Sequence, residues 1–288
     1  MSARTDGLTL GLVGAGIGAS LTPAMHEREA REQGLLLRYH LVDAEARSFG
    51  VDELPDLLRW ARTLGFSGLN VTHPFKQAVV GLLDDVDDAA ADLGAVNTVV
   101  WREGRSVGHN TDCTGYGRAF AAGLGDAPRD RVVLLGAGGA GLAVGYALLE
   151  QGVGTLVVHD ADAGRAEEAA VRLEKRFAAE RIEVLVDPAR LPAALAVADG
   201  LVNATPVGML GYGGVPIDPE LLQARTWVSD VVYFPLHTPL IRAAAERGCR
   251  TLPGGAMAVG QAVDAFALFT GRAADADRMA RHFAELTR

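Results

Sequence analysis

The sequence predicts an α/β protein with two α/β domains, the second of them a doubly wound Rossmann dinucleotide-binding domain. Short apolar runs alternate with amphipathic runs along nearly all of the 288 residues, which is the order that builds sheets covered by helices. A glycine-rich motif opens the second half. A polar break containing glycine and proline lies at residues 123–131. We place the domain boundary before this break, with one domain at residues 1–106 and the Rossmann domain at 107–249.

The first half of the chain alternates expected strands and expected helices. The expected strands are at residues 8–13, 38–42, 68–72 and 94–101, and the expected helices are at 23–34, 51–64 and 76–83. An acidic, alanine-rich run at residues 84–92 is typical of a solvated helix face. This alternation predicts a sheet with helices packed on it.

The glycine-rich motif follows an apolar strand at residues 132–136. Its pattern, G-x-G-x-x-G, starts at Gly136 and opens a helix-like run at residues 140–150. Such glycines allow a tight turn, close approach of the backbone to a pyrophosphate and close packing of helix on strand. The next strand, residues 156–158, leads to Asp160, whose carboxylate could accept hydrogen bonds from a ribose diol. The alternative is an ordinary glycine-rich turn between a strand and a helix.

The remainder of the second half continues the same alternation. Further strands are expected at residues 182–186, 200–204, 228–232 and 250–252, and helices at 163–179, 189–198, 239–248, 257–270 and 274–286. In a doubly wound sheet the C-terminal ends of the strands line the ligand crevice.

A rival dinucleotide motif lies at residues 14–19, with Asp43 as its candidate acid. It is weaker, because an extended stretch separates it from the next helix, which starts near Pro23. That stretch carries two hydroxyls, Ser20 and Thr22, which suit a carboxylate or a polyol better than a pyrophosphate. The alternative for Thr22 is that it only caps the helix.

Three polar residues of the first half of the chain are candidates for chemistry. Lys76 is expected in the first turn of a helix, where the helix dipole lowers the pKa of an amine toward the range that a general acid or base needs. Asn97 lies in an apolar strand and needs a hydrogen-bond partner. Asp112 could cap the helix expected at residues 116–123 or pair with Lys76. For Lys76 the alternative is a solvated surface lysine.

The composition excludes several classes of function. The net charge of −9 argues against nucleic acid and acidic membranes as partners. The 7 histidines show no metal-ligand spacing, so no metal is predicted. Cys113 and Cys249 are expected to be thiols in a reducing compartment. The sequence shows no signal peptide and no apolar run of membrane-spanning length, which favours a cytoplasmic location.

These features coincide with a family pattern, and the chain resembles the shikimate and quinate dehydrogenase family over almost its whole length. The matching pieces, in chain order, are Ser20-x-Thr22-Pro23-x-x-His26, Asn70-Val71-Thr72-x-Pro74-x-Lys76, Gly94-Ala95-Val96-Asn97-Thr98, Gly108-x-Asn110-Thr111-Asp112-x-x-Gly115, the glycine motif, Asn203-Ala204-Thr205-Pro206-x-Gly208-Met209, Asp230-Val231-Val232-Tyr233, Thr238-Pro239-Leu240, and Gly254-x-x-Met257 with Gln261-Ala262.

The resemblance implies a substrate-binding N-terminal domain, completed by C-terminal helices within residues 250–288, with the active site in the cleft beside the Rossmann domain. It implies that Lys76 and Asp112 form the acid/base pair. The substrate carboxylate is then held by Ser20, Thr22 and Tyr233, and the ring hydroxyls by Thr72, Lys76, Asn97, Asp112 and Gln261. The cofactor residues that it implies are Gly136, Ala137, Gly138, Gly139, Ala140, Gly141, Asp160, Arg165, Thr205, Pro206, Val232, Gly254 and Met257.

Two departures from the commonest form of the family indicate the cofactor and the substrate. Members that use NADP carry an Asn-Arg-Thr-like run after the second Rossmann strand, whereas this chain has His159-Asp160-Ala161-Asp162. Two carboxylates repel a 2′-phosphate and accept from a free 2′-hydroxyl, so we expect NAD, although Arg165 lies nearby. The Ser20-x-Thr22 pair replaces two serines and is similar to members that also oxidise quinate.

The prediction is therefore an NAD-dependent oxidoreductase that acts reversibly on quinate, shikimate or 3-dehydroshikimate, as a monomer or a homodimer. The alternatives are an NADP-dependent biosynthetic shikimate dehydrogenase and a non-catalytic sensor of metabolites or nucleotides on the same fold.

Overall fold

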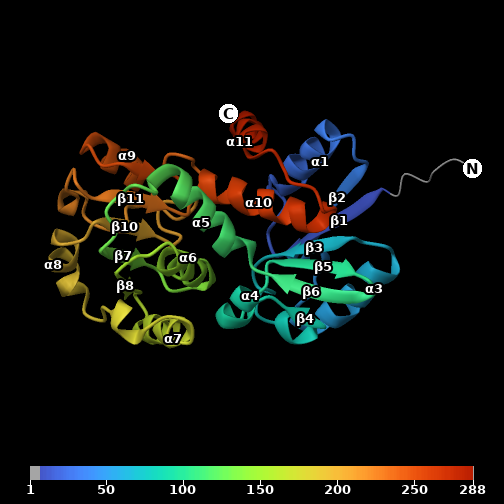
Figure 1. Cartoon of the computed structure of the whole chain (residues 1–288), viewed down its shortest axis with the longest axis horizontal. Coiled ribbons are helices and arrows are strands. Elements are labelled where there is room, and N and C mark those ends of the chain that lie inside the picture. The colour runs from blue at the N-terminus through green and yellow to red at the C-terminus, as the bar shows by residue number, and fades with distance from the viewer. Residues whose placement is uncertain (1–6, 288) are drawn as a thin grey trace, which may run out of the picture. The chain divides into compact units, whose positions relative to one another are not determined.

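The computed structural model describes residues 7–287 and divides them into two compact units (Figure 1). The first contains the chain up to Thr111 together with the chain from Gln261 onward, and the second is Asp112–Gly260. The fold class predicted from the sequence, two α/β units with a doubly wound second one, is confirmed.

Both boundaries between the units differ from the expected ones. We expected one domain at residues 1–106 with 250–288 and the other at 107–249, and residues 1–6 and 288 of the first lie outside the described part. Strand β6 (Arg105–His109) pairs along its whole length with β5 (Thr98–Arg102), so a boundary after residue 106 would divide a strand. Strand β12 (Thr251–Leu252) pairs with β11 (Trp227–Asp230), so the chain leaves the second unit only after it.

The sheet of the first unit has six strands in the order β2-β1-β3-β5-β6-β4. The strands not yet given are β1 (Leu8–Gly14), β2 (Leu37–Asp43), β3 (Gly68–Val71) and β4 (Asp85–Val86). Strand β1 is parallel to β2 and β3, whereas β5 is antiparallel to β3 and β6. The short β4 and the polar β6 were not expected, because neither has the apolar run that marks a buried strand.

Helices cover both faces of this sheet, as the alternation of side chains along the strands requires. The helices of this unit are α1 (Thr22–Glu32), α2 (Ala44–Arg47), α3 (Leu54–Thr63), α4 (Asp88–Leu93), α11 (Ala276–Leu286) and most of α10 (Gly255–Thr270). Leu10 and Leu12 of β1 pack with α10 residues such as Phe266, whereas Val13 packs on the other face with Leu54 and Leu58 of α3.

The helix expected at residues 76–83 is wrong. Phe75 and Val79 are both fully buried and have helical spacing, and the Val79 N–H donates to the Phe75 carbonyl over 3.0 Å. That single turn does not propagate, and it leads into a short 3₁₀ helix at Val80–Leu82. Two β-branched residues and Gly81 follow the buried Phe75, and all three disfavour an α-helix.

The sheet of the second unit has the order β12-β11-β10-β7-β8-β9, and every neighbouring pair is parallel. Its other strands are β7 (Arg131–Leu135), β8 (Thr155–His159), β9 (Ile182–Val184) and β10 (Gly200–Asn203), and its helices are α5 (Thr111–Leu124), α6 (Gly139–Glu150), α7 (Ala163–Leu173), α8 (Leu191–Ala196) and α9 (Pro239–Glu246). The strand order reverses between β7 and β10, which places the ligand crevice of such a sheet at their C-terminal ends.

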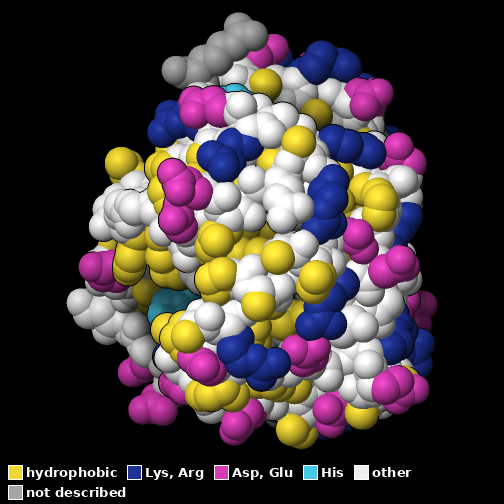
Figure 2. Space-filling view, turned by 90° about the vertical axis from the view of Figure 1, so that its left-hand side faces the viewer, with side chains coloured by type: hydrophobic (Ala, Val, Ile, Leu, Met, Phe, Trp, Pro, Cys, Tyr) yellow, Lys and Arg dark blue, Asp and Glu magenta, His cyan; other side chains and the backbone are white. Residues whose placement is uncertain are grey.

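The face of the molecule on which α8 lies carries side chains of both charges, interspersed with apolar ones (Figure 2). Among residues 7–287, no helix is long and apolar enough to cross a lipid bilayer.

A histidine of α1 is buried in the core of the first unit, against aromatic side chains of β2 and α10. His26 is fully buried, and its ring centroid lies 5.2 Å from that of Tyr39, 6.0 Å from that of Phe266 and 5.9 Å from that of Phe269. Neither ring nitrogen has a hydrogen-bond partner within the described residues. Burial lowers the pKa of His26 to about 3, although the charge of Glu29 opposes the shift.

The buried Glu29 joins α1 to α11. Its carboxylate accepts from the Arg278 guanidinium at 2.6 and 2.7 Å, from the Gln33 amide at 2.7 Å and from the Asp275 N–H at 3.0 Å. Burial alone would raise the pKa of Glu29, but these donors lower it. The pairing is complete enough for the charge to remain in the core.

A second buried carboxylate joins three elements of the second unit. Asp230, at the end of β11, is 1% exposed and accepts from the Asn203 amide and the Val232 N–H, both at 3.0 Å. The Thr238 hydroxyl donates to it over 2.7 Å and in turn caps α9 by accepting from the Ile241 N–H. Burial raises the pKa of Asp230 to about 6, against the opposing effect of these hydrogen bonds.

We expect His26 to reduce the stability of the folded protein as the pH falls below about 6.5. The unfolded chain binds a proton there that the folded ring accepts only near pH 3, so stability falls with a slope of up to about 1.4 kcal/mol per pH unit. Urea unfolding between about pH 7 and pH 5 measures the slope. The variant His26→Phe should flatten it, and the control His40→Gln removes an exposed histidine of β2. Equal slopes for wild type and H26F would contradict the assignment.

Asp230 is expected to act in the opposite direction. The folded state keeps the Asp230 proton up to about pH 6, whereas the unfolded chain releases it near 3.8, so this carboxyl lowers stability as the pH rises between those values. The near-isosteric Asp230→Asn removes the titration. The difference in unfolding free energy between the two proteins should therefore change across that range by up to about 3 kcal/mol and stay constant above it. A difference independent of pH would contradict the raised pKa.

Candidate active site

Two hydroxyls lie side by side where the chain passes from β1 into α1. The Ser20 and Thr22 oxygens are 3.2 Å apart, and both residues are half-buried. Helix α1 begins at Thr22 itself and has no side-chain cap, so the alternative that Thr22 only caps the helix is wrong. Because the Thr22 hydroxyl is not committed to a helix N–H, it can donate to an anion such as a carboxylate.

Asp43 holds the glycine-rich loop that precedes these hydroxyls. Its carboxylate accepts from the Gly16 N–H at 3.0 Å and the Ile17 N–H at 2.9 Å, and it also caps α2 through the N–H groups of Glu45 and Ala46. Desolvation would raise the pKa of Asp43, but these backbone donors lower it. Since both oxygens serve the protein's own backbone, Asp43 is poorly placed to receive a ribose diol.

Asn97 stands at the centre of a buried polar network at the same edge of the first sheet. Its side-chain oxygen accepts from the Thr111 N–H at 2.7 Å and from the Thr98 hydroxyl at 3.1 Å. Its amide nitrogen donates to the Thr111 hydroxyl at 3.0 Å and to Gln261 at 3.5 Å. The structure therefore brings together Asn97 and Gln261, which are 164 residues apart in the chain.

Asn70 extends this network toward the core. Its side-chain amide donates to the Thr98 hydroxyl at 2.9 Å and to the backbone carbonyl of Asn97 at 3.2 Å. Its side-chain oxygen accepts from the Tyr39 hydroxyl at 2.6 Å. Asn70, Thr98 and Thr111 were recognised only as parts of motifs and not assigned to the site. The signal that could have marked them was the presence of polar side chains in apolar strand sequence, which need buried partners.

Lys76 is half-buried and adjoins Asn97 through the backbone. Its carbonyl accepts from the Val96 N–H over 2.9 Å, which ties the lysine to the residue before Asn97. Lys76 lies in a turn and at no helix N-terminus, so no helix dipole acts on its amine. Thr72, half-buried, follows β3 directly, and its N–H donates to the Val13 carbonyl over 2.8 Å.

Asp112 and Tyr233 belong to the second unit and lie within electrostatic reach of each other. Helix α5 begins at Thr111, five residues earlier than expected, so Asp112 lies inside its first turn and does not cap a helix starting at residue 116. Asp112 is 8% exposed. Burial first, and then the negative charge of Asp112, raise the pKa of the Tyr233 phenol. That phenol therefore stays protonated and remains a hydrogen-bond donor.

The glycine-rich turn of the second unit has the geometry of a dinucleotide site. Gly136 has φ +92°, and a Cβ at Gly141 would lie 1.9 Å from the Gly136 carbonyl oxygen, so only glycine permits this packing of α6 on β7. Gly138, the N-cap of α6, has no side-chain cap, and a Cβ there would meet no atom within 4 Å. The residues Gly136, Ala137, Gly138, Gly139, Ala140 and Gly141 thus leave an open helix N-terminus where backbone N–H groups can meet a pyrophosphate.

Asp160 follows β8 and faces this turn. One carboxylate oxygen accepts from the Ala137 N–H at 2.8 Å and the other from the Asp162 N–H at 2.9 Å. Asp162 caps α7, and its carboxylate lies 3.6 Å from the Arg165 guanidinium, whose side chain is 67% exposed. One acid is therefore fixed beside the glycine turn, while Arg165 is largely exposed and lies beside an acidic neighbour.

The other expected cofactor residues follow the ends of β10 and β11 or open α10. Thr205 donates from its hydroxyl to the Asn203 side chain at 2.6 Å, and Pro206 comes next in the chain. A Cβ at Gly254 would lie 2.5 Å from the Val232 carbonyl oxygen, which brings these two together. Met257, half-buried, lies in the first turn of α10. Asp230 joins the ends of β10 and β11 here and was not assigned from the sequence.

Among residues 7–287, no three histidine, cysteine or acidic side chains form a group that could hold a metal ion. The polar groups at the site-bearing edges of the two sheets are instead hydroxyl, amide, amine and carboxyl groups, together with the open N-terminus of α6.

Comparison with known proteins agrees with these features. The model of the shikimate dehydrogenase substrate-binding domain matches residues 12–99. A shikimate dehydrogenase (NADP(+)) of Pseudarthrobacter chlorophenolicus is 52% identical over 99% of this chain and 97% of its own length. A quinate/shikimate dehydrogenase (NAD(+)) of Corynebacterium efficiens is 48% identical over 98% of this chain and 99% of its own.

A solved structure shows the same fold. Quinate dehydrogenase from Corynebacterium glutamicum, in complex with NAD, superposes with a TM-score of 0.92 at 46% identity, over 97% of this chain and 99% of that one. Relatives of nearly equal similarity thus differ in the cofactor that their names carry. The chain belongs to the shikimate dehydrogenase family, whose members are oxidoreductases that act on CH–OH groups.

Proposed function

We propose that the chain catalyses the reversible, NAD-dependent oxidation of the 3-hydroxyl of quinate or shikimate to the 3-dehydro acid. The observation that carries the choice of NAD is the Asp160 carboxylate, which is fixed 2.8 Å from the Ala137 N–H at the glycine turn. A carboxylate there accepts hydrogen bonds from a ribose diol and repels a 2′-phosphate. Relatives named for NAD support the proposal.

Most of the residues proposed to bind the substrate belong to the first unit, and Asp112 and Tyr233 belong to the second. The paired hydroxyls of Ser20 and Thr22 would bind the carboxylate, and the phenol of Tyr233 would contribute to the same contact. The ring hydroxyls would bind Thr72, Lys76, Asn97, Asp112 and Gln261. This division matches the chemistry available, because neutral donors suit an anion, while the amides, the amine and the carboxylate together can both give and receive hydrogen bonds.

Lys76 would carry the proton in this reaction. In the direction of oxidation its neutral amine accepts the proton of the substrate hydroxyl as the carbonyl forms, and in reduction its ammonium returns it. Asp112 would orient the amine and set its proton affinity. A bound nicotinamide would accept the hydride from the same carbon, and the protein would orient the two reactants.

A second candidate is an NADP-dependent biosynthetic shikimate dehydrogenase. The exposed Arg165 favours it, because a rotation away from Asp162 would offer a guanidinium to a 2′-phosphate. The relative that is 52% identical carries NADP in its name. Initial rates with quinate and shikimate, each with NAD⁺ and NADP⁺, distinguish the two candidates. A higher kcat/KM with NADP⁺ would overturn our choice.

The variant Lys76→Ala should lower kcat by about 10²–10⁴-fold, because a positioned acid/base group contributes that much. The KM for the cofactor should change little. Steady-state kinetics measure both constants. The matched control is Lys175→Ala, since Lys175 is the other lysine of the sequence and is exposed. A kcat within a few-fold of the wild type would remove Lys76 from the proposed mechanism.

The variant Asp160→Asn should shift the cofactor preference toward NADP⁺. An asparagine oxygen can still accept from the Ala137 N–H and so keep the contact with the turn, whereas the bond from the Asp162 N–H is lost and the charge that repels a 2′-phosphate is removed. We expect the ratio of kcat/KM for NAD⁺ to that for NADP⁺ to fall by about tenfold, or about 1.4 kcal/mol. The control is Asp187→Asn, because Asp187 belongs to the same unit and caps a short helix other than the one that the glycine turn opens. An unchanged ratio would contradict the assigned role of Asp160.

A further inference from the structure

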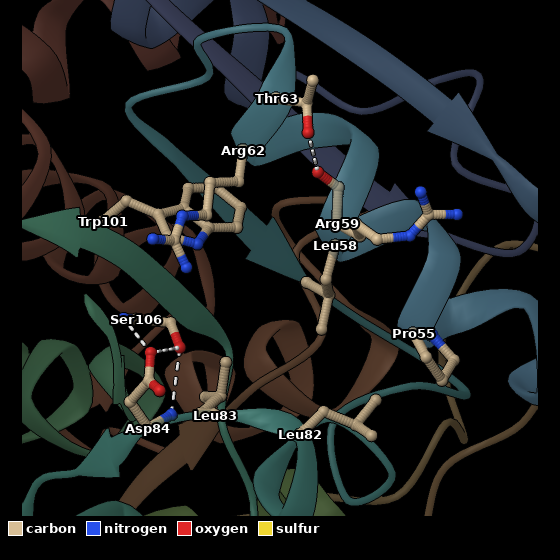
Figure 3. Close-up of a pocket in the computed structure, with 10 residues that line it drawn as sticks. All are labelled: Pro55, Leu58, Arg59, Arg62, Thr63, Leu82, Leu83, Asp84, Trp101 and Ser106. Atoms are coloured by element: carbon tan, nitrogen blue, oxygen red, sulfur yellow. Dashed lines mark hydrogen bonds between the residues drawn. The ribbon is translucent and has the colours of Figure 1, made fainter. Parts of the chain in front are cut away.

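A groove lies in the first unit between α3 and the hairpin formed by β5 and β6 (Figure 3). Its cavity volume is about 580 Å³, within the usual range of small-molecule sites. Helix α3 forms one wall, residues 82–84 form the opposite one, and Trp101 and Ser106 complete the lining. Neither the proposed mechanism nor the family pattern uses this groove.

The groove is separate from the substrate edge. Trp101 and Ser106 face each other in the β5–β6 register, near the turn of that hairpin. Asn97 precedes β5 and lies four residues before Trp101, which corresponds to about 13 Å along a strand. None of the residues that we assign to substrate or cofactor lines the groove.

Arg62 supplies a positive charge in this groove. Within residues 7–287 its guanidinium has no hydrogen bond and no ion pair, although it lines the cavity next to Trp101 (Figure 3). Arg59, one turn earlier on α3, is bound to the Asp56 carboxylate at 2.9 Å and lies over the Trp60 ring at 4.8 Å. The two arginines of this helix therefore differ, and of the pair only Arg62 is available to an anion.

The nearby Asp84 interacts electrostatically with Arg62 but forms its hydrogen bonds with Ser106. Its carboxylate accepts from the Ser106 N–H at 2.7 Å and from the Ser106 hydroxyl at 2.8 Å. These hydrogen bonds, together with the charges of Arg105 and Arg62, lower the pKa of Asp84. Asp84 remains charged and fixed to β6, so it limits the groove to ligands with a single negative charge.

Apolar side chains line the rest of the groove. Leu58 is 8% exposed, and Leu83 and Trp101 are half-buried and pack against the core beneath. Leu82, 41% exposed, extends this surface outward. A flat or cyclic hydrocarbon could cover these side chains, while a carboxylate at its edge could receive both N–H groups of the Arg62 fork.

We propose that this groove is a second binding site, for a small monocarboxylate that carries an aromatic or alicyclic ring. The carboxylate pairs with Arg62, and the ring lies against Leu58, Leu83 and Trp101. A neutral ring lacks the charge partner, and a dianion meets the repulsion of Asp84. The proposal does not depend on the identity of the substrate or the cofactor.

Benzoate is the probe, titrated into the full chain while the indole N–H signals are followed by NMR. The chain has 3 tryptophans, and the variant Trp101→Phe identifies the Trp101 signal. We expect a saturable shift of that signal and weaker binding by at least tenfold for benzamide, the neutral isostere. Arg62→Gln should weaken benzoate binding at least tenfold, whereas the control Arg59→Gln should change it less than twofold.

A third variant distinguishes binding of benzoate in the groove from binding at the proposed substrate edge. Ser20→Ala with Thr22→Val removes the paired hydroxyls and should leave the Trp101 shift unchanged. A shift that this double variant abolishes would overturn the proposal, because the ligand would then lie at the substrate edge. An absent Trp101 shift, or equal losses in R62Q and R59Q, would also overturn it.

Discussion

In both units a carboxylate at the C-terminal end of a parallel strand holds the backbone of the glycine-rich turn on the neighbouring strand. Asp43 does so for Gly16 and Ile17, and Asp160 for Ala137. A glycine-rich turn has many accessible conformations, and fixing it requires an acceptor for its exposed N–H groups. The location of the hydroxyl pair in the first unit and of the open helix N-terminus in the second both depend on these contacts.

The two carboxylates differ in how many backbone donors they receive. Asp43 accepts from four N–H groups, because it also caps a helix that begins immediately after it. Asp160 accepts from two, and the cap of the following helix is Asp162. Under the proposed function, Asp160 therefore differs from Asp43 in the lone pairs that it has left for a ligand. The sequence does not show this difference, because both motifs consist of a strand, a glycine-rich turn and a later aspartate.

The order of the Rossmann strands and its glycine turn could be predicted because both leave local signals, apolar runs of strand length and glycines at fixed spacing. The false helix after Phe75 arose from two buried side chains at helical spacing that belong to a single turn. Helix α5 starts early because the Thr111 N–H is satisfied by Asn97, a partner that sequence spacing does not reveal. The network around Asn70 and the role of Asp230 were missed for the same reason, since they depend on contacts between distant segments.

The polar network behind Asn97 explains why this edge can be both specific and rigid. The network consists of Tyr39, Asn70, Asn97, Thr98 and Thr111, and each of these residues gives or receives hydrogen bonds within it. A satisfied buried network permits few alternative arrangements. The Lys76 carbonyl is bound to the residue next to Asn97, so the amine and the amide are set by the same backbone. In the proposed mechanism, proton transfer at Lys76 and recognition of a ring hydroxyl at Asn97 would therefore be geometrically linked, because a shift of this backbone would displace both groups together.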